Sequence, residues 1–462
     1  MKKKLAWIIW ALSSLALSGY LGNELLFEKE KPNFLIGQST SGHHQIELAC
    51  STCHTDPFGG GEVLQNACLN CHEEELTLAQ DSHPGKKFND PRNADLISVL
   101  DARQCITCHS EHNPDITRPM GVTMPEDYCV QCHQDIATER PSHDGMGFET
   151  CASSGCHNYH DNRALYEDFL LKHGHGELQT PIKSASTDEY LLAEFLHDQG
   201  ITWQDDKKIL EKNSAIVLPE DTEITNLWHN SPHQLNGIGC LTCHTRNSNE
   251  LKTGTKNELT ITNKNINKKI FFNEKPGIDA CSQCHQSEAK GFLEGKHGMR
   301  LAQQLQPMSP AMARANMQPN AHQELSCASC HNPHSLDLQP AKVDACLGCH
   351  ADDHSTAFLA SPHGKLWLSN AEIEVTCATC HMPKVSTEIN GKRHISVEHN
   401  QNATLRPSEK MIRSSCLNCH TLQFSLDALA DETLIKNNFN GKPTTNILSI
   451  EMAKEREQQK NP

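Results

Sequence analysis

A run of apolar residues stands near the start of the chain. Three lysines at positions 2–4 precede an apolar stretch from Leu5 to Leu21. A basic start followed by such a run is typical of a secretory signal peptide, and Ala16 and Ser18 provide small residues for cleavage. The run is also close to the length that spans a membrane. The pattern predicts a signal peptide or signal anchor over residues 1–22 and export of the remainder.

Beyond this run, the apolar positions form only short patterns. Leu191, Leu192, Phe195 and Leu196 follow a helical spacing. Residues 247–275 are expected to form a surface hairpin or flexible insertion, with alternation from Leu259 to Thr262. Residues 424–439 read as helical and the last twelve as a charged tail. Pro and Gly lie mainly around cysteine motifs. The pattern predicts short helices separated by turns.

Composition leaves little material for ordinary protein cores. Hydrophobic residues make up 37% of the 462 residues and aromatic residues 5%, which is low for a globular chain. Another apolar component must therefore supply much of the core.

All cysteines belong to one kind of motif. The 22 cysteines form ten C-x-x-C-H motifs and one stretched motif, C-x-x-x-x-C-H. The ten cysteine pairs are Cys50 and Cys53, Cys68 and Cys71, Cys105 and Cys108, Cys129 and Cys132, Cys240 and Cys243, Cys281 and Cys284, Cys327 and Cys330, Cys346 and Cys349, Cys377 and Cys380, Cys416 and Cys419; the stretched pair is Cys151 and Cys156. Their histidines are His54, His72, His109, His133, His157, His244, His285, His331, His350, His381 and His420.

This motif is the attachment site of haem c. Two thiols add to the two vinyl groups of haem, and the adjacent histidine reaches the iron as proximal ligand. A single C-x-x-C would also fit a thioredoxin-type pair or half a zinc site, but the repetition with histidine excludes those readings. We interpret the stretched motif in the same way. The sequence predicts eleven covalently attached haems c and leaves no cysteine for disulfides, zinc or nucleophilic catalysis.

The motifs divide the chain into two groups. Five lie between Cys50 and His157 and six between Cys240 and His420, with none in residues 179–228. We expect a pentahaem module over residues 23–178, a helical linker over 179–228, a hexahaem module over 229–430 and a charged tail over 431–462. The predicted fold is mainly α with extensive loops, in which two haem-packed modules have little conventional hydrophobic core. Folding should depend on haem insertion.

Of the 29 histidines, 18 remain to provide sixth ligands, so bis-histidine coordination is possible throughout. Three stand in C-H-x-x-H strings, whose second histidine typically ligates a neighbouring haem in multihaem cytochromes: His112, His160 and His334. Five more lie in recurring loop contexts: His83, His143, His233, His297 and His363. One of His43 and His44 is expected to ligate an early haem. His173, His175, His354, His394 and His399 stay undecided, and His197, His229 and His322 are expected at the surface.

Charge is distributed unevenly. Residues 23–178 contain 25 acidic against 10 basic side chains, and residues 179–462 contain 32 against 28. Such a field disfavours nucleic acid and would attract a basic partner to the first module, although a charged surface that keeps the protein soluble explains it nearly as well.

Residues 40–178 resemble class III and pentahaem electron-donor cytochromes in motif density and C-H-x-x-H strings. The stretch TCATCHMPKVSTEINGKRHISVEH, residues 376–399, resembles pentahaem nitrite reductases and octahaem hydroxylamine oxidoreductases, and residues 406–420 resemble the last haem-binding helix of the latter. This resemblance implies a mainly helical second module with His394 or His399 as a distal ligand. The chain lacks the C-x-x-C-K motif of the reductases, and its last tyrosine is Tyr190, so neither family's catalytic haem is supported.

These observations favour an exported, periplasmic electron relay that exchanges electrons with redox partner proteins, such as a membrane quinol-oxidising complex or other cytochromes. The N-terminal segment could hold it at the membrane, or it could act outside the cell. A second hypothesis is a reductase or oxidase of a small nitrogen or sulfur compound at an open haem of the second module. A third is a subunit of a conducting filament, with His43 or His44 ligating a haem of the next copy.

Overall fold

The computed structural model describes residues 2–28, 30–56, 59–140, 143–144, 159–161, 167–180, 222–229, 231–235, 238, 240–246, 261–263, 266–272, 275–335, 337–369, 373–389, 392–405 and 409–460. The stretched motif, most of the predicted linker and residues 247–260 of the predicted insertion lie outside these residues.

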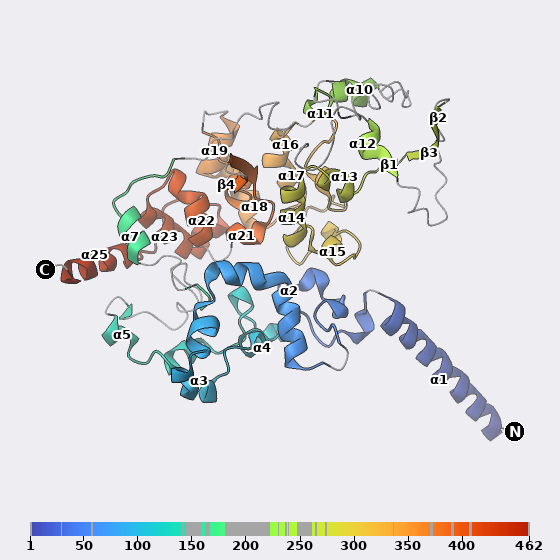
Figure 1. Ribbon diagram of the computed structural model, residues 1–462, viewed down its shortest axis with the longest axis horizontal. Helices are drawn as coiled ribbons and strands as arrows, with labels where there is room; N and C mark the ends of the chain where they lie inside the picture. Colours follow the sequence, from blue (N-terminus) through green and yellow to red (C-terminus); the bar gives the residue numbers. More distant parts are fainter. Residues whose placement is uncertain are drawn as a thin grey trace.

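Short helices dominate the described chain, which confirms the predicted fold class (Figure 1). The α-helices are α1 (Lys2–Phe27), α2 (Gly61–Ala79), α3 (Ala94–Val99), α4 (Cys105–Cys108), α5 (Ile136–Glu139), α7 (Glu167–His173), α10 (Thr222–His229), α11 (Pro232–Leu235), α12 (Cys240–His244), α13 (Ile278–Ser282), α14 (Gln286–Glu294), α15 (Met299–Ala302), α16 (Gln339–Lys342), α17 (Asp344–Leu347), α18 (Asp353–Ala357), α19 (Pro362–Leu368), α20 (Cys377–His381), α21 (Gln401–Leu405), α22 (Glu409–Ser414), α23 (Leu422–Ala430), α24 (Glu432–Lys436) and α25 (Ser449–Lys460).

Single helical turns connect many of these elements. Turns of 3-10 helix occupy Pro32–Phe34, His44–Ile46, Cys50–Thr52, Pro91–Asn93, Pro114–Ile116, Pro119–Gly121, Glu126–Gln131, Pro310–Met312, Cys327–Ser329, Phe358–Ala360 and Cys416–Asn418, and a π-helix occupies Ser82–Phe88. Several begin with proline, whose fixed φ suits a first helical position.

Two small antiparallel sheets interrupt the helices. Strands β1 (Thr245–Arg246), β2 (Ile261–Asn263) and β3 (Ile266–Phe272) form one in the order β1-β3-β2, in the region where an insertion was expected. Strands β4 (Lys384–Ile389) and β5 (Lys392–Val397) form a hairpin in which Lys384 pairs with Val397. This hairpin directly follows the motif that ends at His381.

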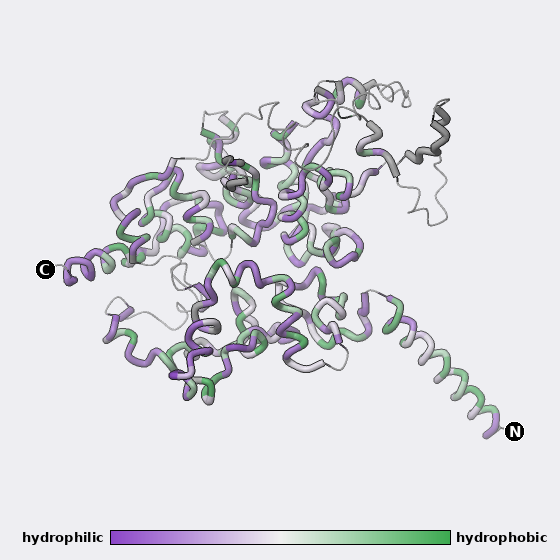
Figure 2. Tube along the Cα trace, viewed as in Figure 1, coloured by the Kyte–Doolittle hydropathy of each residue, from purple (hydrophilic) through white to green (hydrophobic). Residues whose placement is uncertain are grey.

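Helix α1 extends away from the rest of the protein (Figure 1). Its Lys3–Phe27 segment is long and apolar enough to cross a membrane, and its most apolar 18-residue stretch is not buried. Figure 2 shows the apolar character along its length. The helix fits a signal peptide. Near its end, Glu24 is buried and accepts a hydrogen bond from the Asn33 backbone N–H at 3.0 Å.

A conventional hydrophobic core joins α7 to the C-terminal helices. Its buried members are Leu170, Ile412, Leu417, Leu422, Leu426, Ile450 and Ala453. Helix α7 thus packs on the far end of the chain, although its residues fall within the segment 23–178 that was expected to form the first module. The expected charged tail is also partly folded, since α25 presents Ile450 and Ala453 to this core while its other positions carry charge.

Oppositely charged side chains join the two groups of motifs. In Figure 1 the segment from residue 30 to about 140 lies below the second group, and α2 runs along the boundary. Four glutamates of the first group face basic residues of the second: Glu30 with Arg300, Glu47 with Arg314 at 2.6 Å, Glu74 with Lys290 at 2.9 Å, and Glu75 with Lys410 at 3.7 Å. Part of the acidic excess of residues 23–178 is therefore neutralised within the chain.

Arg300 is the most buried of these cations, with 5% of its surface exposed. Its guanidinium donates hydrogen bonds to the carbonyl oxygens of Gln45 and Gln306 as well as to Glu30. Ile46 and Ala49 pack beside it against Leu305.

We predict that Arg300→Leu lowers the free energy of unfolding by about 2 kcal/mol, because it leaves buried carbonyl acceptors without their charged donor. Lys290→Leu breaks an exposed pair and should cost under about 1 kcal/mol. Guanidinium unfolding of the haem-loaded protein, followed by circular dichroism, compares the two. Equal decreases in the free energy of unfolding of the two variants would contradict the larger contribution that we assign to Arg300.

Candidate haem sites

Each of the ten C-x-x-C-H motifs folds as one helical turn. In seven of them the histidine backbone N–H donates to the carbonyl oxygen of the first cysteine, as His54 does to Cys50 at 2.8 Å and His420 to Cys416 at 2.8 Å. The other three lie within α2, α12 and α20. Residues i, i+3 and i+4 share one face of a helix. The turn therefore presents both sulfurs and the imidazole to the same side, as haem attachment requires.

Hydroxyl side chains fix two of these turns. Ser326 and Ser329 form a capping box around the motif that starts at Cys327, and Thr376 and Thr379 do the same around the motif that starts at Cys377. Each box satisfies backbone N–H groups that a helix end leaves without partners. The local sequences, S-C-A-S-C-H and T-C-A-T-C-H, thus encode the turn directly.

A second imidazole faces the motif histidine at nine sites. The distances between ring centres are 6.0 Å for His72 and His43, 6.2 Å for His109 and His160, 6.2 Å for His133 and His83, 6.1 Å for His244 and His334, 6.2 Å for His285 and His233, 6.3 Å for His331 and His399, 6.2 Å for His350 and His297, 6.0 Å for His381 and His354, and 6.0 Å for His420 and His363.

This spacing fits a bis-histidine haem. A metal lies about 2.0 Å from an imidazole nitrogen, so one iron between two imidazoles puts the ring centres about 6 Å apart. Stacked or hydrogen-bonded rings would lie closer. The narrow range from 6.0 to 6.3 Å at nine sites therefore matches the cofactor that the cysteines predict.

The structure places most of the expected distal histidines beside a motif histidine. Six of the eight do so: His83, His160, His233, His297, His334 and His363. Among the described residues, His112 and the motif histidine His54 have no ring contact with another imidazole, and His112 Nδ1 lies 2.8 Å from the Gly37 carbonyl oxygen. His143 lies among the described residues. The stretched motif, with Cys151, Cys156 and His157, lies outside them, so a neighbour is assigned neither to His157 nor to His54.

The histidines left undecided separate clearly. His354 and His399 each face a motif histidine, and so does His43. No motif histidine lies beside His44 among the described residues, and its buried Nε2 has no hydrogen-bond partner. Only backbone pairing is described for His394, which lies opposite Thr387 in the β4–β5 hairpin. His322, expected at the surface, is exposed and bonds the Asn320 carbonyl.

Comparison with known proteins agrees with this geometry. Residues 42–134 match the cytochrome c3 family, and residues 99–339 match the family of MtrC/MtrF-like outer membrane cytochromes, domains II/IV. The second match covers more than half of the 462 residues. The chain belongs to this family. It is also 21% identical over 351 residues to the nine-haem cytochrome c of Desulfovibrio desulfuricans, a match that covers 70% of this chain and 82% of that protein.

These matches make the chain a multihaem c-type cytochrome that binds haem c covalently and transfers electrons. The match to cytochrome c3 confirms the expected resemblance of the first motif group to class III cytochromes. The resemblance of residues 376–420 to the hydroxylamine oxidoreductases stays a prediction.

Burial favours the neutral form of nine of the paired imidazoles of this cytochrome. It lowers the pKa of His297 and of His381 to about 4, and lowers the pKa values of others in the same direction: His83, His109, His233, His331, His334, His363 and His420. Iron binds the neutral form of imidazole. The sites are therefore ready to bind metal at pH 7.

The Nδ1 atoms are held by two kinds of acceptor. Backbone carbonyls hold several of them: Gly37 holds His112 at 2.8 Å, Tyr159 holds His83 at 2.8 Å, Gly121 holds His109 at 3.2 Å, Ile435 holds His354 at 2.5 Å, and Val397 holds His399 at 2.8 Å. Carboxylates lie within hydrogen-bond distance of two, since Glu111 lies 2.6 Å from His43 and Asp81 lies 2.7 Å from His160. Two more carboxylates lie farther off, Glu75 at 3.7 Å from His72 Nδ1 and Asp352 at 3.7 Å from His350 Nδ1. A hydrogen bond at Nδ1 leaves Nε2 to face the iron, and at His354 the Asn438 amide lies 3.3 Å from Nε2. No sequence pattern marks the carboxylates of Glu111 and Asp81.

Glu111 lies in a network of hydrogen bonds. Besides His43, it accepts from the Thr40 backbone N–H at 2.6 Å and from Thr40 Oγ1 at 2.9 Å. Burial alone would raise the pKa of Glu111, but the hydrogen bonds from His43 and Thr40 outweigh it and lower this pKa to about 2. The carboxylate is therefore ionised at neutral pH.

Several buried polar atoms of the first motif group have no protein partner. They include Tyr128 Oη, Tyr159 Oη and Arg140 Nη1. Burial raises the pKa of Tyr128 to about 12, so its hydroxyl stays protonated. Buried donors without partners are rare, and haem carries two propionate carboxylates that would accept from such groups. These atoms thus also fit the cofactor.

Neighbouring motifs touch through their cysteines. Three pairs of first cysteines are hydrogen-bonded across successive motifs: Cys68 with Cys105, Cys281 with Cys327, and Cys346 with Cys377. The charges of Cys346 and Cys349 also reach Cys330, and that of Cys419 reaches Cys380. Because each sulfur attaches at the edge of a macrocycle, the edges of successive haems would lie side by side.

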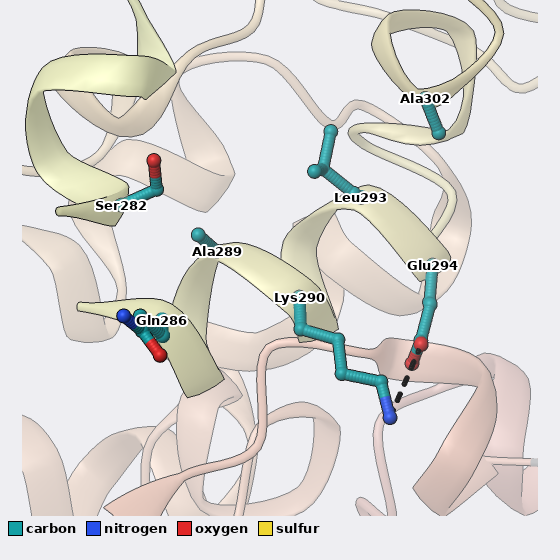
Figure 3. Close-up of a pocket in the computed structure, with 7 residues that line it drawn as sticks. All are labelled: Ser282, Gln286, Ala289, Lys290, Leu293, Glu294 and Ala302. Atoms are coloured by element: carbon teal, nitrogen blue, oxygen red, sulfur yellow. Dashed lines mark ion pairs between the residues drawn. The ribbon is translucent and has the colours of Figure 1, made fainter.

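One open cavity of about 430 Å³ lies beside the motif that starts at Cys281. Figure 3 shows Leu293 of α14 on the side of Ala302 and Ala289 on the side of Ser282, with the ion pair of Lys290 and Glu294 along another edge. The walls are largely apolar. Lys290 also binds Glu74, so this cavity opens close to the boundary between the two motif groups.

Proposed function

We propose that this cytochrome is an exported relay that carries eleven haems c and passes electrons between redox partners without substrate chemistry of its own. The observation that carries the proposal is the pairing in the second motif group. All six of its motif histidines, His244, His285, His331, His350, His381 and His420, face a second imidazole among the described residues. Iron with two histidine ligands has no site for a substrate and exchanges electrons with little rearrangement.

The axial assignments follow from the nine pairs, in which the motif histidine is the proximal ligand and its neighbour the distal one. For the first motif, His112 is the proposed distal ligand of the iron bound to His54. Glu111 lies close enough to Cys53 for its charge to raise the pKa of that thiol, and His112 follows Glu111 directly. The bond to Gly37 orients the His112 ring. His143 remains for His157.

The residues around the haem sites set the spacing of the haems and the environment of their ligands. The cofactor supplies a one-electron couple. The chain holds successive sulfurs in contact, and burial raises the pKa values of Cys380 and Cys416 and lowers that of His381, which marks their surroundings as poor in water. Those conditions favour fast exchange along the motif order within each group.

Export is part of the proposal, since α1 fits a signal peptide and the matching family is described as outer membrane cytochromes. A basic or neutral redox partner would meet the acidic surface that the boundary ion pairs leave uncovered. A quinol-oxidising complex or another cytochrome is the class of partner that this chemistry requires.

The function is tested by electron paramagnetic resonance of the fully oxidised protein, quantified against haem. We expect eleven haems per chain, all low-spin. If about one iron in eleven is high-spin and its signal shifts on adding nitrite, hydroxylamine or sulfite, the relay proposal fails and an enzyme is indicated. A high-spin signal that disappears on raising the protein concentration would instead indicate a ligand from a second copy, as in a filament.

The axial assignments are tested by His334→Ala, which should convert one low-spin iron to high-spin because His244 loses the imidazole opposite it. His322→Ala is the matched control, since this exposed histidine has no ring contact and its removal should change no iron. The same spectra read out both. A wholly low-spin His334→Ala protein would refute the pairing.

A further inference from the structure

Two axial pairs differ from the others in what holds the imidazole. The distal candidates His43 and His160 each have Nδ1 within hydrogen-bond distance of a carboxylate, at 2.6 Å from Glu111 Oε1 and 2.7 Å from Asp81 Oδ1. In the second motif group, by contrast, His354 and His399 donate to the backbone carbonyls of Ile435 and Val397. His233 likewise bonds the Pro333 carbonyl. A charged acceptor thus replaces a neutral one at two sites of the first group.

Both carboxylates are fixed in place by the surrounding chain. Glu111 is held by Thr40 through two hydrogen bonds, and 28% of its side chain is exposed. Asp81 is equally shielded, with 28% of its side chain exposed. It follows the end of α2, where Gln80 and Asp81 have φ values of +61° and +40°. This left-handed backbone costs on the order of 1 kcal/mol per residue, so the packing that aims Asp81 at His160 must offset that cost.

A carboxylate behind an imidazole changes the iron opposite. Accepting the Nδ1 proton's hydrogen bond draws the ring towards imidazolate and makes Nε2 a stronger donor. The stronger donor stabilises ferric iron, with its extra positive charge, more than ferrous iron. A neutral carbonyl acceptor has a weaker effect of the same sign. The net negative charge of the carboxylate adds to this preference over the short distance involved.

From these contacts, the structure assigns to Glu111 and Asp81 the role of positioning residues that lower the reduction potentials of the haems bound by His72 and His109. The inference rests on the proposed axial ligation by His43 and His160. The two haems belong to successive motifs whose first cysteines, Cys68 and Cys105, are in contact. They therefore form one adjacent low-potential pair.

This placement gives the relay a direction. Electrons that reach the low-potential pair leave it readily for haems whose distal histidines, such as His354, His399 and His233, are held by neutral backbone carbonyls. The motif of His72 lies on α2, whose Glu74 and Glu75 bind Lys290 and Lys410 of the second group. The pair thus lies next to the boundary that electrons must cross, and the energetic step favours transfer from the first group to the second.

The test uses the full-length, haem-loaded protein. Glu111→Gln and Asp81→Asn keep the size and an acceptor oxygen of each side chain but remove its charge. In a potentiometric titration followed by haem absorbance, each variant should move one of the lowest-potential steps upward, and the double variant should move two. We expect at least a tenfold change in the reduction equilibrium, which for a one-electron couple is about 59 mV.

Glu74→Gln is the matched control, because it removes one charge from α2 without touching an imidazole. It should leave the lowest steps in place. An equal shift in this control would reduce the effect to net charge and overturn the inference. Unchanged lowest steps in both Glu111→Gln and Asp81→Asn would overturn it as well.

Failure of the inference is distinguishable from failure of the ligand assignment. His43→Ala and His160→Ala should each produce one high-spin iron if these histidines are axial ligands. High-spin iron in both variants together with unshifted potentials in Glu111→Gln and Asp81→Asn would refute the tuning alone. Low-spin spectra in both alanine variants would refute the axial assignment and, with it, this inference.

Discussion

The separation of paired imidazoles is the constraint on which the rest of the structure depends. Each pair must hold two rings with their centres about 6 Å apart, one from a motif turn and one from elsewhere in the chain. A chain of short turns can meet many such conditions, whereas long helices could not bend to all of them. The scarcity of buried apolar side chains follows, since macrocycles between the rings would replace them. Among the described residues, the larger core of the usual kind is formed by α7 and the C-terminal helices, and a smaller one by Ile46, Ala49 and Leu305.

Ion pairs join the two motif groups to each other. Residues 23–178 carry a strong acidic excess, and this excess would ordinarily be interpreted as a docking surface. Four of its glutamates instead bind cations of the second motif group, and buried Arg300 also binds one backbone carbonyl of the first, that of Gln45. Exposed pairs contribute little energy each, but together they fix which motifs of the two groups approach one another. Orientation, more than stability, is therefore what this charge pattern supplies.

The sequence predicted the attachment of haem better than it predicted which histidine faces each motif histidine. The C-x-x-C-H spacing defines the motif turn by itself, because residues i, i+3 and i+4 share a helical face. The C-H-x-x-H strings correctly drew attention to His160 and His334, which the structure sets beside motif histidines. His354 and His399 carry no such local mark, because what selects them is the folding of distant segments: α18 against α24, and the β4–β5 hairpin against α14. The role of α25 was missed for a similar reason, since two buried residues in a charged stretch give a weak signal.

Short segments that belong to several sites at once explain how the first motif group becomes rigid. Asp81 holds His160, while two residues later His83 donates to the carbonyl of Tyr159 and stacks on its ring at 4.4 Å. Each segment thus orients a ligand of the other, and neither site can open without disturbing its neighbour. The string from His109 to His112 repeats this logic, since Glu111 lies within it and holds His43. The residues inside a C-H-x-x-H string can therefore matter as much as the histidines that define it, because they couple one haem to the ligand of the next.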